Sequence, residues 1–149
     1  METNKGRVVI EMLPDVAPNH VSRIKELVRQ QFYDGIVFHR VIEGFMAQTG
    51  DPLGKGTGGS GKNIKAEFNA VPFDRGVVGM ARANHPDSAD SQFFIMFEDG
   101  HFLNNNYTVW GRVIEGMDKI DSLKMGAQGS GTVSGERDNI VTMRVQADQ

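Results

Sequence analysis

The residues of this sequence that are suited to chemistry gather in one stretch, 38–51, which reads FHRVIEGFMAQTGD. It holds one cation, Arg40, one amide, Gln48, and several apolar neighbours, among them Met46. Residues two apart on an extended strand share a face, so Met46 and Gln48 point the same way. The stretch combines hydrogen-bond donors with apolar side chains and has no evident nucleophile. This combination favours binding of a neutral peptide over its cleavage.

His39 and Arg40 are adjacent, so a strand points their side chains to opposite faces. We therefore expect His39 to be a structural histidine with its hydrogen bonds satisfied, and not a base. Arg40 has a second interpretation at this stage, a structural ion pair with Glu43 or Asp51. The apolar residues of the stretch are likewise typical of an ordinary core as well as of a ligand pocket.

The elements that must position this stretch are mostly short strands. Runs rich in β-branched and aromatic residues predict strands at 7–13, 38–42, 45–49, 77–81, 91–97, 107–113 and 140–145. Apolar residues at helical spacing predict a helix that starts at Pro18 and a shorter one that Gly126 ends. Arg23 belongs to the polar face of the first helix, which we expect to be solvated. Many short strands with two helices indicate a closed antiparallel barrel.

Length and composition limit the class of protein. The chain has 149 residues, 39% of them apolar, and a formal charge of -3, which predicts one folded domain, residues 1–149. The sequence has no block of basic residues that would indicate a nucleic-acid or membrane partner. The absence of cysteine excludes disulfides and thiol catalysis. No apolar run reaches the roughly 20 residues that span a bilayer. We expect a cytoplasmic monomer, with the periplasm as the alternative if a leader was removed.

A glycine-dense loop, 50–61, almost spells a phosphate-binding P-loop with the lysine that follows it. A P-loop needs a hydroxyl after its lysine and a helix behind it. Here Asn63 follows Lys62, and Pro72 arrives before two full helical turns. Nucleotide binding is therefore a minor alternative. We expect the glycines to let the backbone approach closely either a ligand chain or the barrel itself.

Several motifs in this order resemble the signature of the cyclophilins, the peptidyl-prolyl cis-trans isomerases. They are FHRVI at 38–42, GFM at 44–46, Gln48, and GD at 50–51, and the resemblance extends over nearly the whole chain. It implies a closed eight-stranded β-barrel with a helix at each end. The first strand is absent or short here, since five residues precede Gly6. It also implies catalysis of rotation about Xaa-Pro bonds in proline-containing peptides and unfolded chains, without a cofactor or metal.

The resemblance assigns roles to individual residues. Arg40 resembles the catalytic arginine, and Phe45 and Gln48 complete the predicted catalytic group. The predicted substrate-binding residues are Met46, Gly56, Ala81, Arg82, Ala83, Gln92, Phe94, Phe102, Leu103 and Tyr107. Within this set the proline pocket consists of Phe45, Met46, Phe94 and Leu103, while Gln48 and Gln92 hold the peptide backbone.

The chemistry that Arg40 suits is the twisting of an amide. Rotation about an Xaa-Pro bond has a barrier of about 20 kcal/mol because the nitrogen shares its lone pair with the carbonyl. Twisting makes that nitrogen pyramidal and basic, so a donor aimed at it binds the twisted form best. A guanidinium stays charged and needs no proton transfer. A module that holds Xaa-Pro segments as a chaperone or scaffold, without turnover, is the alternative function.

Three positions depart from the family pattern. Phe102 stands where many cyclophilins have a tryptophan that donates to cyclosporin, so weaker binding of that drug is expected. Tyr107 stands where the family often has a histidine. Arg82 replaces a small polar residue, and its side chain is expected to bias substrates toward acidic neighbours. His85 and His101 have no second ligand at metal spacing, so no metal site is predicted.

Overall fold

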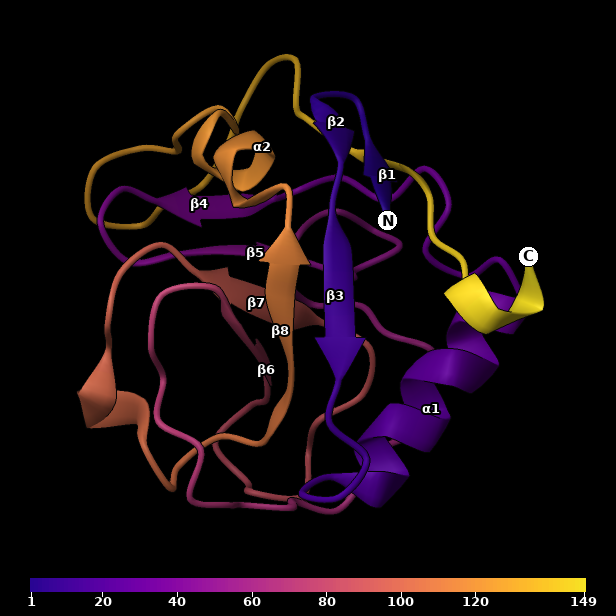
Figure 1. Cartoon of the computed structure of the whole chain (residues 1–149). Helices are drawn as coiled ribbons and strands as arrows, with labels where there is room; N and C mark the ends of the chain where they lie inside the picture. Colours follow the sequence, from indigo (N-terminus) through magenta and orange to yellow (C-terminus); the bar gives the residue numbers. More distant parts are fainter.

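The computed structural model describes all residues, 1–149, and shows a mainly β chain with two α-helices (Figure 1). The strands are β1 (Glu2–Thr3), β2 (Gly6–Arg7), β3 (Val9–Met12), β4 (Arg40–Ile42), β5 (Met46–Thr49), β6 (Val77–Met80), β7 (Phe93–Met96), β8 (Val109–Glu115) and β9 (Ile140–Thr142). The helices are α1 (Pro18–Arg29) and α2 (Met117–Asp121), with 3-10 turns η1 (His101–Leu103) and η2 (Gln146–Asp148). The strand-rich prediction is confirmed. None of the helices is long and apolar enough to cross a membrane.

The strands form two antiparallel sheets. Six strands pair in the order β3-β8-β6-β7-β5-β4, and three pair in the order β2-β1-β9. Isolated bridges Val37↔Asn139 and Arg40↔Thr132 connect the β4 side to the segment before β9. On the other side β3 is an edge strand, and a cavity of about 300 Å³ lies beside it, against α1 and the segment that follows β9. Strand pairing therefore does not form one closed ring, and the closed eight-stranded barrel stays a prediction.

The six-stranded sheet separates two apolar clusters. Along β4, β5, β7 and β6 the row Val41–Ala47–Ile95–Val78 faces the main core, which contains 24 buried residues and packs against α1. The adjacent row, Arg40–Gln48–Phe94–Gly79, faces the opposite side. There a second cluster of seven buried residues forms, with Met46 and Phe94 among them. Strand alternation therefore aims the predicted site residues away from the main core.

Helix α1 begins at Pro18 as predicted and buries Val21, Ile24, Leu27 and Val28. It ends at Arg29, two residues before Gln31, which takes a left-handed conformation with φ of 60°. Arg23 corrects the prediction of a solvated polar face. It is 8% exposed and donates to the Ser60 hydroxyl at 2.6 Å and to the Lys62 carbonyl at 3.0 Å. Arg23 is thus buried, and its hydrogen bonds link α1 to the glycine loop.

Gly79 allows aromatic rings to lie flat on the outer face of the sheet. The Phe73 and Phe94 rings stack with centroids 5.7 Å apart and planes inclined by 17°. A Cβ at position 79 would lie 2.6 Å from Phe73 Cε1 and 2.8 Å from Phe94 Cζ. Sequence reasoning did not assign this glycine to the site, although a glycine inside an apolar strand signals close approach.

We expect Gly79→Ala to destabilise the protein by about 1 to 3 kcal/mol, because overpacking forces both rings to move. The free energy of unfolding in urea measures the change. A second variant, Gly79→Ala with Phe73→Leu, should recover part of the loss by making room for the new methyl group. An alanine variant as stable as the wild type would show that the ring packing does not require a glycine.

Candidate active site

A chain of hydrogen bonds runs across the outer face of the sheet from Arg40 to the glycine loop. Arg40 Nη1 donates to Gln48 Oε1 at 3.3 Å, and Gln48 Nε2 donates to Gln92 Oε1 at 2.9 Å. Gln92 Nε2 then donates to the Gly58 carbonyl at 2.9 Å. Arg40 Nε donates to the Ser130 carbonyl at 3.2 Å. The partners of Arg40 are neutral, so the alternative of an ion pair with Glu43 or Asp51 is not realised.

The predicted proline-pocket residues lie beside this chain in the second apolar cluster. Met46, Phe94 and Leu103 are buried there, and Phe45 packs against them half-buried. Two aromatic contacts shape the rim: Tyr107 meets Phe94 edge-on with centroids 5.7 Å apart, and Phe102 lies 5.6 Å from Phe45. Phe102 is 72% exposed. The arrangement is an apolar floor with aromatic walls next to a cation.

The remaining predicted residues line a mostly polar cavity of about 430 Å³ on the other side of the glutamines. Its walls include Gln48, Gln92, Gly56, Ala81, Arg82 and Ala83. Because both glutamine side chains border this cavity and also join the chain from Arg40, cavity and pocket adjoin. All predicted site residues are therefore brought together on one face. The cavity beside β3 involves none of them.

The glycine loop is held by two carboxylates. Asp51 accepts the amides of Leu53, Lys55 and Gly56 at 2.8, 3.0 and 2.6 Å, and Asp90 accepts those of Ser60 and Gly61 at 2.9 Å each. The amides that a phosphate would need are thus occupied, and no helix follows the loop between 64 and 71. The nucleotide-binding alternative therefore fails on geometry.

The glycines of this loop approach the protein's own carboxylates. A Cβ at Gly58 would overlap Asp51 Oδ1, and a Cβ at Gly59 would lie 2.5 Å from Asp90 Oδ2. The glycines were expected to approach either a ligand chain or the protein itself. At Gly58 and Gly59 they approach the protein itself. Sequence reasoning missed Asp51, Asp90 and Arg23 as the residues that shape the loop. Asp90 and Arg23 meet partners 29 to 39 positions away. The amides that Asp51 accepts lie only two to five positions ahead, a local pattern typical of an aspartate at a turn.

His39 lies buried below the loop, and neither ring nitrogen has a hydrogen-bond partner. Burial lowers the pKa of His39, opposed by nearby Asp51 and assisted by Arg137 and Arg40. A lowered pKa keeps the imidazole neutral, which suits a structural residue. The prediction that its hydrogen bonds would be satisfied is wrong, because the ring sits among backbone and side chains that offer it no partner.

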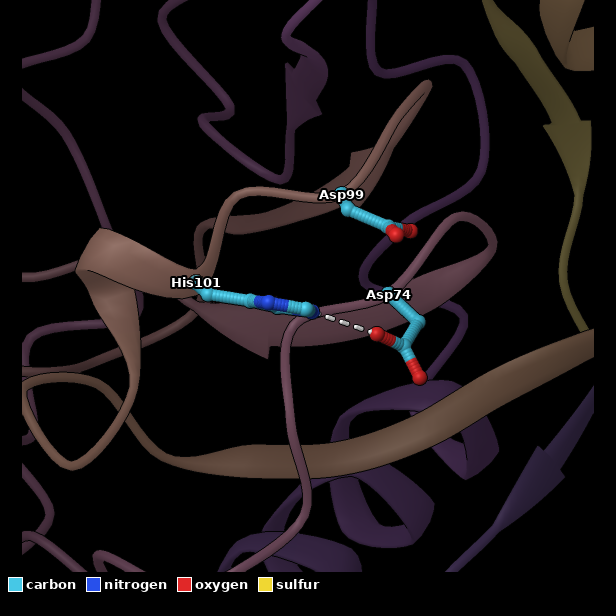
Figure 2. Close-up of side chains that lie close together, drawn as sticks. All are labelled: Asp74, Asp99 and His101. Carbon is cyan, nitrogen blue, oxygen red and sulfur yellow. Dashed lines mark hydrogen bonds and ion pairs between the residues drawn. The ribbon is translucent and has the colours of Figure 1, made fainter.

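At the start of η1, Asp74 meets two side chains that are distant from it in sequence, Asp99 and His101 (Figure 2). His101 Nε2 lies 2.7 Å from Asp74 Oδ1, and Asp99 completes a cluster whose ligand-type atoms lie within 4.8 Å of one another. Spacing in the sequence did not reveal these neighbours of His101, since it cannot show contacts between loops, and the absence of a metal site stays a prediction. Because Asp74 follows Phe73 and His101 precedes Phe102 and Leu103, the ion pair fixes one edge of the apolar pocket.

Asp51 provides a test of the loop. Burial alone would raise the pKa of Asp51, but bonds from the amides of Leu53, Gly58, Lys55 and Gly56 outweigh it and hold the pKa below its ordinary value. We expect Asp51→Asn to lower the free energy of unfolding by about 1 to 3 kcal/mol at pH 7. A depressed pKa gives stability that is present above about pH 4 and lost as pH falls through the folded value.

Urea unfolding of both proteins at pH 7 and pH 3 measures this, and the gap between them should narrow at pH 3. Asp15→Asn, at an exposed position, is the matched control. If the two proteins have the same free energy of unfolding at pH 7, or if the difference between them is as large at pH 3 as at pH 7, this account of Asp51 is contradicted.

His101 provides a second test. The hydrogen bond to Asp74 raises the pKa of His101 above its ordinary value, with Asp74 and Asp99 adding charge attraction. The ion pair is therefore present below the ordinary histidine pKa of about 6.5 and is lost as pH rises through the raised value. In an NMR titration, Asp74→Asn should lower the pKa of His101. A titration that does not change would mean that the contact is absent in solution.

Comparison with known proteins agrees with this geometry. The family model described as "Cyclophilin type peptidyl-prolyl cis-trans isomerase/CLD" matches residues 1–145. A probable peptidyl-prolyl cis-trans isomerase of Brucella suis is 48% identical, over 99% of this chain and 82% of its own length. Peptidyl-prolyl cis-trans isomerase B of Bacillus subtilis is 40% identical, over 81% of this chain and 85% of its own.

Solved structures show the same likeness. A cyclophilin-type isomerase from Cryptosporidium parvum, crystallised in the presence of the dipeptide Ala-Pro, superposes with a TM-score of 0.87 at 29% identity, covering 95% of this chain and 94% of its own. The cyclophilin AquaCyp293 of Hirschia baltica gives a TM-score of 0.83 at 32% identity, over 95% of this chain and 70% of its own. With its strand order, its arginine-and-glutamine row and its apolar pocket, this chain belongs to the cyclophilin-type peptidyl-prolyl cis-trans isomerases.

Proposed function

We propose that this isomerase rotates Xaa-Pro bonds by seating the proline ring in the pocket of Phe45, Met46, Phe94 and Leu103 while Arg40 donates to the prolyl nitrogen. The observation that carries the proposal is the place of Arg40. It lies in the same cross-strand row as Gln48 and Phe94, at the end of the row and directly opposite the amide of Gln48. Its Nε and Nη1 are engaged by the protein, and its Nη2 makes no hydrogen bond within it, which leaves a donor for substrate.

The required rate enhancement fits such a site. Uncatalysed exchange takes tens to hundreds of seconds, so a turnover of about 10 to 1000 per second needs roughly 4 to 7 kcal/mol of barrier lowering. One charged hydrogen bond to the twisted nitrogen supplies part of this. The apolar pocket supplies more, because removing water from the amide strengthens the bond from Arg40 and disfavours the polar planar amide.

The glutamines anchor the peptide backbone on one side of the bond that rotates, and the apolar pocket holds the proline ring on the other. Gln48 and Gln92 hold each other at 2.9 Å, so each side chain is fixed before substrate arrives. Both border the polar cavity with Gly56 and Ala81–Ala83, where an extended peptide can add its backbone. A fixed backbone anchor on one side and a seated proline ring on the other restrict motion to the bond between them, which is how positioning lowers a barrier.

The proposed substrates are proline-containing peptides and unfolded or flexible protein chains, consistent with the Ala-Pro dipeptide present with the Cryptosporidium relative. No step requires a cofactor or metal. Phe102 has no donor on its exposed ring, which supports weak binding of cyclosporin. We further propose that residues 1–149 form one domain, built as a barrel, that acts as a monomer in the cytoplasm to assist folding.

Exchange at the Xaa-Pro bond of a short peptide, followed by two-dimensional NMR, tests the role of Arg40. Arg40→Ala should lower catalysed exchange at least tenfold because the donor to the nitrogen is gone. Arg40→Lys should fall between, since its ammonium lacks the planar set of donors. Arg112→Ala is the matched control, because this arginine is exposed and pairs with Glu11.

Circular dichroism establishes that the variants are folded. If the wild type binds the peptide and leaves exchange at the uncatalysed rate, the isomerase proposal fails and a module that only holds Xaa-Pro segments replaces it. If Arg40→Ala retains full activity, the isomerase remains but the donor must be sought elsewhere on the row.

A further inference from the structure

We propose that Arg82 is a positioning residue that clamps together two segments of the substrate-binding face, and that it is not a reader of substrate charge. The inference rests on the proposed function, because it concerns how the same site is held in shape. The two segments are the loop after β6, residues 81–84, and the loop before β8, residues 104–107. They are 24 positions apart at the Arg82–Asn106 contact.

The guanidinium of Arg82 joins these loops through backbone carbonyls. Its Nε and Nη2 donate to the Asn106 carbonyl at 3.1 and 2.8 Å. Its Nη1 donates to the carbonyls of Ala83 and Asn84 at 3.0 and 3.1 Å. The side chain therefore fixes its own loop and the opposite loop at once.

The flat face of the same group covers an aromatic ring of the pocket rim. Arg82 Cζ lies 4.8 Å from the centroid of the Tyr107 ring and 6.0 Å from that of Phe68. Tyr107 in turn meets Phe94 edge-on at 5.7 Å. A guanidinium stacked on a ring at this distance is attracted by its π-electrons. Arg82 thus holds Tyr107 against the floor of the proline pocket.

A count of donors argues against the expectation that Arg82 selects acidic substrates. A guanidinium has five N–H donors, and four hydrogen bonds to carbonyls already use most of them. Its face is covered by Tyr107. A carboxylate of the substrate would therefore find little of the group accessible, and would gain only screened attraction at an exposed position.

The far end of the 82–88 loop is fixed separately. The Ala83 amide donates to the Ser88 hydroxyl at 2.8 Å, and that hydroxyl donates to the His85 carbonyl at 2.6 Å. Arg82 is thus needed for the link across to residues 104–107 and less for the internal shape of its own loop. Without it, substrate must order Tyr107 and the Ala81–Ala83 backbone when it binds, which costs affinity.

Lysine cannot replace this clamp. An ammonium has three donors at a single point and no flat face, so it cannot reach three carbonyls and cover a ring together. We therefore expect Arg82→Lys and Arg82→Gln to weaken peptide binding by similar factors, about threefold to tenfold. The exchange rate of the bound peptide should change less than about twofold, since Arg40 and the pocket floor stay in place.

The experiment compares two peptides that differ only in Glu or Gln, placed in turn at each of the three positions before proline. NMR titration gives the dissociation constant, and exchange at saturation gives the rate on the enzyme. Arg112→Lys, distant from the site, controls for loss of an exposed arginine, and thermal unfolding establishes that each variant is folded. The proposal predicts equal weakening for both peptides in both Arg82 variants.

Two results would overturn it. If Arg82→Lys binds like the wild type while Arg82→Gln weakens only the Glu peptide, the residue reads charge. If binding is kept and exchange of the bound peptide falls, Arg82 acts on the reacting bond. Failure of the isomerase proposal is distinguishable from both, since it would leave wild-type exchange at the uncatalysed rate whatever residue occupies position 82.

Discussion

The antiparallel register of β4, β5, β7 and β6 is the constraint on which the site depends. It places Arg40 opposite Gln48, Gln48 opposite Phe94, and Phe94 opposite Gly79. A slip of one residue would turn this whole row into the main core and bring Val41, Ala47 and Ile95 to the surface. Burial of that apolar row therefore stabilises the register, and through it the position of Arg40.

The pocket also depends on a charge arrangement that leaves Arg40 free to act. Asp51, one of the two acids considered as a partner of Arg40, has its oxygens occupied by loop amides and does not pair with the guanidinium. Gln48 orients the arginine without removing its charge. A full positive charge beside an apolar surface stabilises a developing lone pair more strongly than the same charge does in water. The glycine loop thus fixes the Gln92 side chain through the Gly58 carbonyl, and its amides occupy the oxygens of Asp51.

The rim of the site is assembled from loops, and long-range polar contacts hold them in place. Asp74 and His101 fix the turn that bears Phe102 and Leu103. Arg23 reaches from α1 to the glycine loop, and Arg82 joins the loops on either side of Tyr107. In each contact the charged side chain forms hydrogen bonds with backbone carbonyls or with a polar side chain of the protein. Such contacts restrict motion of the rim without occupying the apolar floor.

The sequence by itself determined the positions of the strands from β3 to β9, the start of α1 and the family to which the chain belongs. Alternation of side chains and several motifs in order carry that information locally, as in residues 38–51. It could not determine that Arg23 is buried, that His39 lacks partners, that Asp51 and Asp90 hold the glycine loop, or that His101 meets Asp74. Apart from the local bonds of Asp51, these contacts join residues 27 to 39 positions apart, and their partners are backbone groups or single polar side chains whose positions the sequence does not give. Only the tertiary structure, which brings those loops together, decides which donors meet which acceptors.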